Sequence, residues 1–513
     1  MNTEKKIKVL LEMRPAFEGF AGIPQEVRLL YRGLNKIESL TTEGMIQSSA
    51  KVLSRGTKEN SIFADKSETK RINRFSKAII SLSENPHATI KDAIYWFIAR
   101  KMISTTLVLR GIFFNAKINL TKFESKHFGD FVWRSMFSKT LPASDYDVVT
   151  KQDFWICSVP WQAMHAVGLN LLNFAENPYY ATLNTKRFDV FIGQTPYPGR
   201  VSKNTAYVIR YHDAIPVFMP HTIPEKSKHQ ATHFYALQDN IKHGAWFACV
   251  SEATRADLIR LFPAAEKKAV TIHNMVSHHY YNENSSRALI SGIIRARLYE
   301  ASGFLPAFFS MREKESFYSK NLFKKEIRYL MMVSTIEPRK NHTRLLAAWE
   351  AIKADIDPDI KLVIVGTLGW DNSAITSAFK PWIDRGELFM LNAVPAPDLR
   401  ALYHHAAATV CPSLGEGFDF SGVEAMASGG VTIASDIPVH REIYDDAALY
   451  FDPYSTASLI KAIKAVLYDD GAQEQRKQMV TDGQEVSKRY QPEVILPRWE
   501  QFIDMITNDK RGE

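Results

Sequence analysis

Short apolar runs recur in both halves of the chain, and helical patterns with turn residues separate most of them. In the first half these runs occupy residues 7–12, 187–194, 206–211, 245–250 and 270–276. In the second half they occupy residues 328–333, 361–365, 388–394, 407–411 and 431–434. Continuous apolar runs of this length are typical of strands buried on both faces of a parallel sheet. Their alternation with helices predicts an α/β fold.

Residues 45–180 do not follow this alternation, and we interpret them as a largely helical insertion. Residues 90–110 read as one helix that carries aromatic and periodic basic side chains. The net positive charge also lies in this region, because residues 66–139 contain fourteen Lys and Arg but five Asp and Glu, a net charge of +9, and the whole chain carries +8. Two interpretations stay open. The insertion packs into the core, or it offers a basic amphipathic surface to anionic lipid.

The composition is that of a soluble globular protein, with 45% hydrophobic and 23% charged residues in a chain of 513. This length suffices for two or three domains with full cores. The three cysteines, Cys157, Cys249 and Cys411, have no metal-binding spacing, so we expect buried free thiols in a reducing cytoplasm. The first residues lead directly into a strand pattern, and we expect neither a signal peptide nor a membrane span.

The stretch at residues 411–436 has the pattern of a strand, a glycine-containing loop, a helix and a second strand. Ser421 is the predicted N-cap of the helix. The N-terminus of a helix offers free backbone N–H groups and a partial positive charge, which suit a diphosphate. Glu416 in the loop and Glu424 in the helix could accept hydrogen bonds from sugar or ribose hydroxyls, or they are ordinary surface carboxylates.

Two further positions carry candidate chemistry at the ends of predicted strands. Arg339 and Lys340 lie at a strand-to-helix turn, where adjacent cations and a helix N-terminus could hold a phosphate. An ordinary basic turn is the alternative. The strand that begins at Ala206 ends in His212 and Asp213. A lone histidine at a strand end is either structural or functional.

Residues 411–436 resemble the nucleotide-binding half of retaining glycosyltransferases of family four. The signature of that family is Glu-Gly-Phe-Gly followed by Glu-Ala-Met-Ala-x-Gly, and this chain has Glu416-Gly417-Phe418, Glu424-Ala425-Met426-Ala427 and Gly429. Asp419 stands where glycine is commonest in the family. The resemblance is strong over residues 326–485 and moderate over residues 1–30 and 185–276.

The resemblance implies the GT-B architecture, in which two Rossmann-like domains face each other. Residues 1–325 would form the acceptor-side domain with the insertion at about 45–180, residues 326–485 the nucleotide-sugar-binding domain, and residues 486–513 a helix that crosses back. The catalytic residues implied are His212, Glu416 and Lys340. The substrate-binding residues implied are Gly19, Gly22, Asn274, Arg339, Asn392, Val394, Phe420, Ser421, Gly422 and Glu424.

We therefore expect a retaining glycosyltransferase that moves mannose from GDP-mannose to a glycan or lipid-linked acceptor during lipopolysaccharide O-antigen synthesis. No metal or other cofactor is expected, because Lys340 would take the place of a metal ion. The protein would be cytoplasmic, with peripheral contact to anionic membrane and no nucleic-acid partner. Alternatives are a rhamnosyl- or N-acetylglucosaminyltransferase with a dTDP- or UDP-sugar, a sugar-nucleotide 2-epimerase, and a basic nucleic-acid-binding protein.

Overall fold

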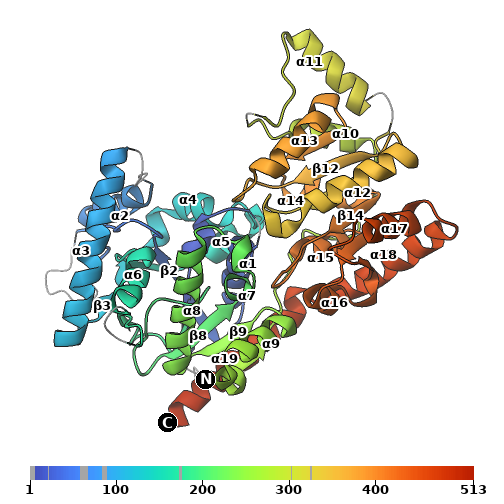
Figure 1. Ribbon diagram of the computed structural model, residues 1–513. Coiled ribbons are helices and arrows are strands. Elements are labelled where there is room, and N and C mark those ends of the chain that lie inside the picture. The colour runs from blue at the N-terminus through green and yellow to red at the C-terminus, as the bar shows by residue number, and fades with distance from the viewer. Residues whose placement is uncertain are drawn as a thin grey trace.

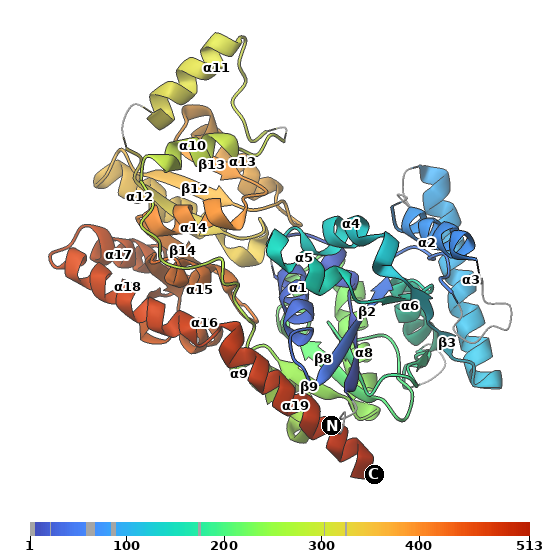
Figure 2. The same cartoon turned by 180° about the vertical axis from the view of Figure 1, so that it is seen from behind.

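The computed structural model describes residues 6–512 except 21, 58–66, 84–88, 173–175, 302 and 324–325. The fold is α/β, with two sheets in two domains that lie side by side (Figures 1 and 2). The first sheet has the strand order β10-β9-β8-β7-β1-β2-β5-β4, and all its neighbouring strands are parallel except β4 and β5. Its strands are β1 (Ile7–Glu12), β2 (Leu40–Gln47), β4 (Thr121–Phe123), β5 (Phe154–Cys157), β7 (Val190–Gly193), β8 (Ala206–Tyr211), β9 (Trp246–Cys249) and β10 (Ala269–Thr271).

The second sheet is parallel throughout and has the order β13-β12-β11-β14-β15-β16. Its strands are β11 (Tyr329–Val333), β12 (Lys361–Val365), β13 (Leu388–Leu391), β14 (Ala408–Cys411), β15 (Thr432–Ser435) and β16 (Ala448–Phe451). A separate pair is formed by β3 (Ile118–Asn119) and β6 (Leu183–Asn184). The apolar run at residues 7–12 is thus confirmed as a strand with the predicted bounds. The strand that begins at Ala206 is also confirmed, but it ends at Tyr211, before His212.

Helices cover both faces of each sheet. In β1, Val9 and Leu11 join the core beneath α1 and α19, whereas Leu10 joins the core beneath α6 and α8. The helices of the first domain are α1 (Ile23–Leu34), α2 (Glu68–Ser83), α3 (Ile90–Phe114), α4 (Gly129–Val132), α5 (Tyr146–Thr150), α6 (Trp161–Leu171), α7 (Ile215–Phe218), α8 (Lys226–Lys242), α9 (Glu252–Leu261) and α19 (Pro492–Gly512). Those packed around the second sheet are α10 (Leu289–Ala296), α11 (Met311–Tyr318), α12 (His342–Asp355), α13 (Ser373–Arg385), α14 (Ala396–His405), α15 (Phe420–Ala427), α16 (Pro438–Tyr444), α17 (Thr456–Leu467) and α18 (Ala472–Lys488).

The prediction of one insertion over residues 45–180 needs correction. Within that range β5 pairs with β2 and belongs to the first sheet, so α2 and α3 form the helical addition between two strands of that sheet. The four-residue run of β5 was missed because an apolar run this short looks the same in a buried helix. Residues of the connector at 277–325 also belong to the second domain, where Ile290 and Ile294 of α10 pack against β11.

The chain returns to the first domain through its last helix. α19 begins at Pro492, within the predicted range of 486–513, and Pro497 lies inside the helix. Trp499, Phe502 and Ile503 are buried in the core that contains β1 and α1. Since α19 follows the second domain in the chain and packs in the first, the chain crosses between the domains twice (Figures 1 and 2).

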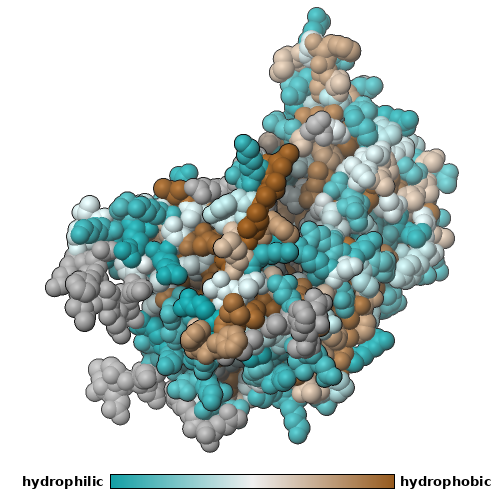
Figure 3. Space-filling model, turned by 60° about the vertical axis from the view of Figure 1, so that its left-hand side comes forward, coloured by the Kyte–Doolittle hydropathy of each residue, from teal (hydrophilic) through white to brown (hydrophobic). Residues whose placement is uncertain are grey.

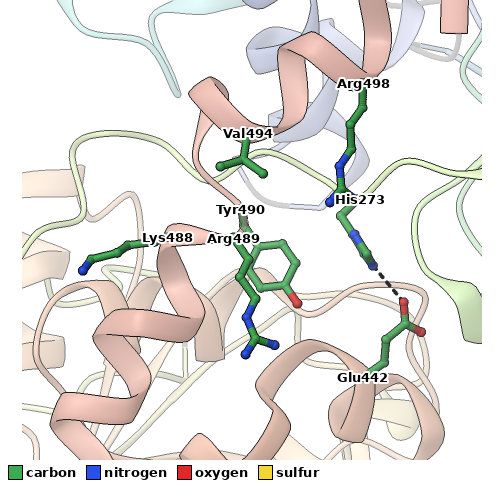
Figure 4. Close-up of a pocket in the computed structure, with 7 residues that line it drawn as sticks. All are labelled: His273, Glu442, Lys488, Arg489, Tyr490, Val494 and Arg498. Atoms are coloured by element: carbon green, nitrogen blue, oxygen red, sulfur yellow. Dashed lines mark hydrogen bonds and ion pairs between the residues drawn. The ribbon is translucent and has the colours of Figure 1, made fainter. Parts of the chain in front are cut away.

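A half-buried carboxylate, that of Glu442, joins the two domains near this crossing. Glu442 of α16 accepts hydrogen bonds from the backbone N–H groups of Glu252 and Ala253 at 2.6 and 2.8 Å, and from His273 Nε2 at 2.8 Å. Figure 4 shows His273 and Glu442 pointing toward each other beside a pocket that Arg498 also lines. Burial alone would raise the pKa of Glu442, but these three bonds outweigh it and lower the pKa.

Candidate active site

A cavity of about 160 Å³ lies between the two domains. Its walls are loops that follow β1 in the first sheet and β11, β12 and β13 in the second, together with the connector between the domains. Ligands of open α/β sheets bind at this carboxyl edge of the strands. Four of the predicted substrate-binding residues line the cavity, and they are Gly19, Asn392, Val394 and Glu424.

Glu424 is a buried carboxylate that both domains hold. Gln25 Nε2 of the first domain donates to Glu424 Oε1 at 2.7 Å, and the Tyr403 hydroxyl of the second domain donates to Oε2 at 3.2 Å. Burial raises the pKa of Glu424 to about 7, and the bonds from Gln25 and Tyr403 offset part of that rise. The Glu424 carboxyl group therefore changes its charge near neutral pH. It also lines the cavity, where its oxygens can accept further hydrogen bonds.

Arg339 and Lys340 form a cationic turn that a carboxylate fills. Arg339 donates to Glu416 Oε2 at 2.8 Å and to Glu337 Oε1 at 2.7 Å, and Lys340 Nζ donates to Glu416 Oε1 at 2.5 Å. Burial would raise the pKa of Glu416, but the charges of Arg339 and Lys340 outweigh it and keep the pKa lowered. A ligand phosphate must therefore compete with the Glu416 carboxylate for these two cations.

The shape of this turn is fixed before any ligand binds. Asn341 has a φ of 61°, in the left-handed region that asparagine tolerates better than most residues, and it precedes α12. Its Nδ2 donates to the carbonyl oxygens of Pro412 at 3.1 Å and Pro453 at 3.0 Å. The cationic turn is thereby attached to the loop after β14, which carries Glu416.

His212 lies against the same loop from the other domain. A Cβ atom at Gly417 would lie 1.7 Å from the His212 carbonyl oxygen, so only glycine allows this approach. Thr254 Oγ1 donates at 3.3 Å to the Gly417 carbonyl and at 3.4 Å to that of His212. Burial lowers the pKa of His212 to about 3, so the imidazole is neutral near pH 7. The structure therefore brings His212 and the Glu416 loop together.

The start of α15 differs from the prediction, because Asp419 and not Ser421 is the N-cap. Asp419 Oδ1 accepts from the backbone N–H of Ser421 at 3.1 Å and from its hydroxyl at 2.7 Å. Its other oxygen lies 3.3 Å from Nε2 of the buried His440. The amide of Ser421 is therefore already satisfied, and the carboxylate at the position where glycine was expected has a structural reason.

The other predicted positions near α15 are also accounted for by packing. Phe420 packs with Phe418 and Val423 in the core between α15 and α16. A Cβ atom at Gly422 would lie 2.3 Å from the Tyr444 ring. These contacts require small or apolar residues at the helix start and seat it firmly in the domain.

Asn274 and Gly22 are among the predicted residues that lie outside the cavity. Asn274 Oδ1 accepts from the buried Arg210 guanidinium at 2.6 Å, and Arg210 also pairs with Glu26 at 2.8 Å. Asn274 therefore supports a buried ion pair of the first domain. Gly22 is the N-cap of α1 and has a φ of 70°, which glycine adopts without strain. Gly22 does not line the cavity.

Sequence reasoning missed several polar residues at this edge. Gln25 was not singled out, although it reaches Glu424 from the first turn of α1. Among the described residues, buried polar atoms without a hydrogen-bond partner include His212 Nε2, both side-chain polar atoms of Gln194 and both ring nitrogens of His165. Gln194 directly follows β7, and a polar residue after a buried strand is the signal that could have identified it.

Comparisons with known proteins fit this geometry. Residues 313–486 match the family Glycosyl transferases group 1, a range that includes Arg339, Lys340, Glu416 and Glu424. A 146-residue stretch, 28% of this chain, is 34% identical to the serotype-specific mannosyltransferase WbdA of Escherichia coli and covers 18% of that protein. A 269-residue stretch, 52% of this chain, is 25% identical to the O-antigen chain mannosyltransferase B of Escherichia coli and covers 62% of it. The matched region thus spans less than two thirds of each of these relatives.

The solved structure of sucrose-phosphate synthase from Thermosynechococcus elongatus has a similar fold. The TM-score is 0.52 at 13% identity, and the match covers 98% of this chain and 100% of the other. At this identity the likeness concerns the fold alone. It confirms the predicted GT-B architecture, with Rossmann-like domains built on parallel sheets.

The raised pKa of Glu424 predicts a pH-dependent stability. Between its ordinary value of 4.5 and about 7 the unfolded chain has released this proton while the folded protein keeps it, so stability is lost as the pH rises through this range. Relative to wild type, Glu424→Gln should gain roughly 2–3 kcal/mol of unfolding free energy between pH 4.5 and 8, measured by urea denaturation. Glu485→Gln, an exposed control, should follow the wild type. An unchanged pH slope in Glu424→Gln would contradict the raised pKa.

Proposed function

We propose that this protein is a glycosyltransferase that moves mannose from GDP-mannose to a glycan or lipid-linked acceptor in O-antigen assembly. One observation carries the proposal. Arg339 and Lys340 form a preformed cationic turn around Glu416, beside His212 of the facing domain, within a segment that matches the family Glycosyl transferases group 1. This arrangement suits a nucleoside diphosphate sugar, whose charge meets the cations and whose sugar lies between the domains.

In this proposal the nucleoside of the donor binds in the cavity, and its diphosphate binds at the cationic turn. Asn392 and Val394 would contact the base, and Glu424 would accept from the ribose hydroxyls. The diphosphate would replace the Glu416 carboxylate on Lys340 and Arg339, which frees Glu416 to accept a hydrogen bond from a sugar hydroxyl. The neutral His212 can hydrogen-bond to the sugar without adding a charge to the site.

The proposed reaction is a substitution at the anomeric carbon with retained configuration. The bond from that carbon to the diphosphate oxygen breaks, and a new bond forms to the acceptor hydroxyl oxygen on the same face. The acceptor proton passes to the departing phosphate, which acts as the base. Negative charge grows on the diphosphate as it leaves, and the fixed charges of Lys340 and Arg339 stabilise it in the transition state. They would supply the charge that a metal ion supplies elsewhere, so no cofactor is part of the proposal.

The choice of mannose rests on the names of two relatives, both mannosyltransferases of Escherichia coli. The acceptor would contact the first domain, where Gln194 and His165 hold buried polar atoms without a partner. We place the protein in the cytoplasm at the inner face of the plasma membrane, where a lipid-linked acceptor would be found. Among the described residues no helix is long and apolar enough to cross a bilayer.

A ligand screen tests the proposal. GDP and GDP-mannose should raise the melting temperature, because a ligand that binds only the folded protein stabilises it by mass action. A larger shift with dTDP- or UDP-sugars would replace mannose by rhamnose or N-acetylglucosamine as the transferred sugar. Nuclear magnetic resonance of the product then decides the chemistry, since a transferase forms a new glycosidic bond with retained configuration. A free 2-epimerised sugar nucleotide, or no effect of any nucleotide, would overturn the proposal.

Lys340→Ala tests the diphosphate contact. Losing a charged hydrogen bond costs roughly 1.5–3 kcal/mol, so the Kd for the nucleoside diphosphate should rise about tenfold or more and transfer should be lost. Arg339 still neutralises Glu416 in this variant, so the fold should persist. Lys380→Ala is a matched control, because that lysine pairs with Asp384 on the exposed side of α13. Equal binding by Lys340→Ala and wild type would exclude the phosphate role.

Glu416→Gln separates binding from turnover. The carboxylate competes with phosphate for two cations, so its removal should tighten nucleoside diphosphate binding, as measured by calorimetry. Turnover should fall, because the amide is a weaker acceptor for the sugar hydroxyl. Exposed Glu474→Gln should change neither quantity. Weaker nucleotide binding in Glu416→Gln would show that the carboxylate only supports the turn.

A further inference from the structure

The helix α3 carries large apolar side chains on its outer surface. The exposed fractions are 56% for Ile94, 52% for Ile98, 66% for Met102 and 72% for Phe113. At 100° per residue these four positions fall within one sector of the helix. Figure 3, which brings the side of α2 and α3 forward, shows apolar side chains at the surface. Of the two interpretations left open by the sequence, packing into the core therefore does not hold for the outer face of this helix.

The inner face of α3 combines small and polar residues with apolar ones such as Leu107, which packs against the core of the first domain. Ser104 is fully buried, and its hydroxyl accepts from Asn170 Nδ2 of α6 at 3.1 Å. A Cβ atom at Gly111 would lie 2.0 Å from the Tyr179 hydroxyl. Arg100 donates to Gln162 Oε1 at 2.9 Å, so it belongs to the inner contact and not to the surface. α3 thus differs from an ordinary surface helix, because large apolar residues lie on its outer face as well as on the face toward the core.

Cations accompany the apolar outer face. Lys91, Lys101 and Arg110 are exposed on α3, and Lys101 Nζ lies 5.3 Å from the centre of the Phe97 ring. The one carboxylate of the helix, Asp92, is used in the capping box, where it accepts from the Thr89 backbone N–H at 3.0 Å. Long basic side chains beside apolar and aromatic groups suit a bilayer interface, because the stems lie along the acyl region and the charges reach the headgroups.

We propose that the outer face of α3 lies in the interface of an anionic lipid bilayer and holds the protein there. The occupant is lipid because the surface joins an apolar stripe to unopposed positive charge, and anionic headgroups complement that charge. α3 lies at the edge of the first domain that is remote from the second domain in both ribbon views (Figures 1 and 2). Docking there leaves the cavity between the domains open. The inference depends on this surface and not on the transfer reaction.

Vesicle flotation of the full chain tests the docking. Wild type should float with vesicles of phosphatidylcholine and phosphatidylglycerol in equal parts, stay behind with phosphatidylcholine alone, and dissociate as salt is raised. A cation near an anionic surface contributes a factor of about five in binding. The triple variant Lys91→Gln, Lys101→Gln, Arg110→Gln should therefore bind about 100-fold more weakly. The triple variant Ile94→Gln, Ile98→Gln, Met102→Gln should also lose binding, because the apolar contact is removed.

Matched controls decide between lipid and other occupants. Exposed methionines on other helices, changed in Met311→Gln with Met505→Gln, should leave flotation as in wild type. All variants alter exposed side chains, so their melting temperatures should equal that of wild type, and glutamine preserves helix propensity. Wild type that ignores anionic vesicles, or α3 variants that still float, would overturn the proposal. So would a wild-type dimer by light scattering that the apolar variant converts to monomer, because the face would then cover a second copy.

Discussion

The ion pairs of Glu416 with Arg339 and Lys340 are the constraint on which the site depends. Two cations and a carboxylate are removed from water here, and such charges are tolerated only when paired and hydrogen-bonded. Asn341 attaches the turn to the loop after β14, so the positions of the cations are set by the fold. A site with its charges already oriented needs little rearrangement when a charged group binds. When no ligand is bound, the Glu416 carboxylate pairs with Arg339 and Lys340, so neither cation is left without a partner.

The site requires both domains. Gln25 of α1 is the donor that reaches Glu424 from across the cavity, and Thr254 of α9 bridges the loop carrying Gly417. Glycine at 417 is what lets this loop touch the end of β8. The helix α19, whose Trp499 lies in the core of the first domain, ties the two halves covalently as well as by packing. Geometry at the cavity therefore depends on how the domains are set against each other.

Local patterns allowed part of this site to be predicted. Arg339 and Lys340 are adjacent in the sequence, and Glu416 and Glu424 flank one turn and helix start, so chain spacing alone places each pair. Apolar runs such as that of β8 also allowed the strand to be predicted from the sequence. What spacing cannot show is a contact across the fold. Gln25 and Glu424, which are hydrogen-bonded, are 399 residues apart. Asn274 was predicted to bind substrate, but its side-chain oxygen accepts a hydrogen bond from Arg210. The apolar outer face of α3 was also not predictable, because apolar residues recur almost all round this helix.

The contact of Glu442 with α9 has a consequence for how the two domains are held together. The carboxylate fills the N-terminus of α9, and its lowered pKa means that this contact contributes stability above the carboxyl's ordinary pKa and is lost as the pH falls. It lies beside α19, the helix that crosses between the domains, so it ties the two domains together at this point. Acid would therefore weaken this link between the domains as the Glu442 carboxyl takes up a proton, while the bond of Gln25 to Glu424 on the cavity side is not held by a lowered pKa.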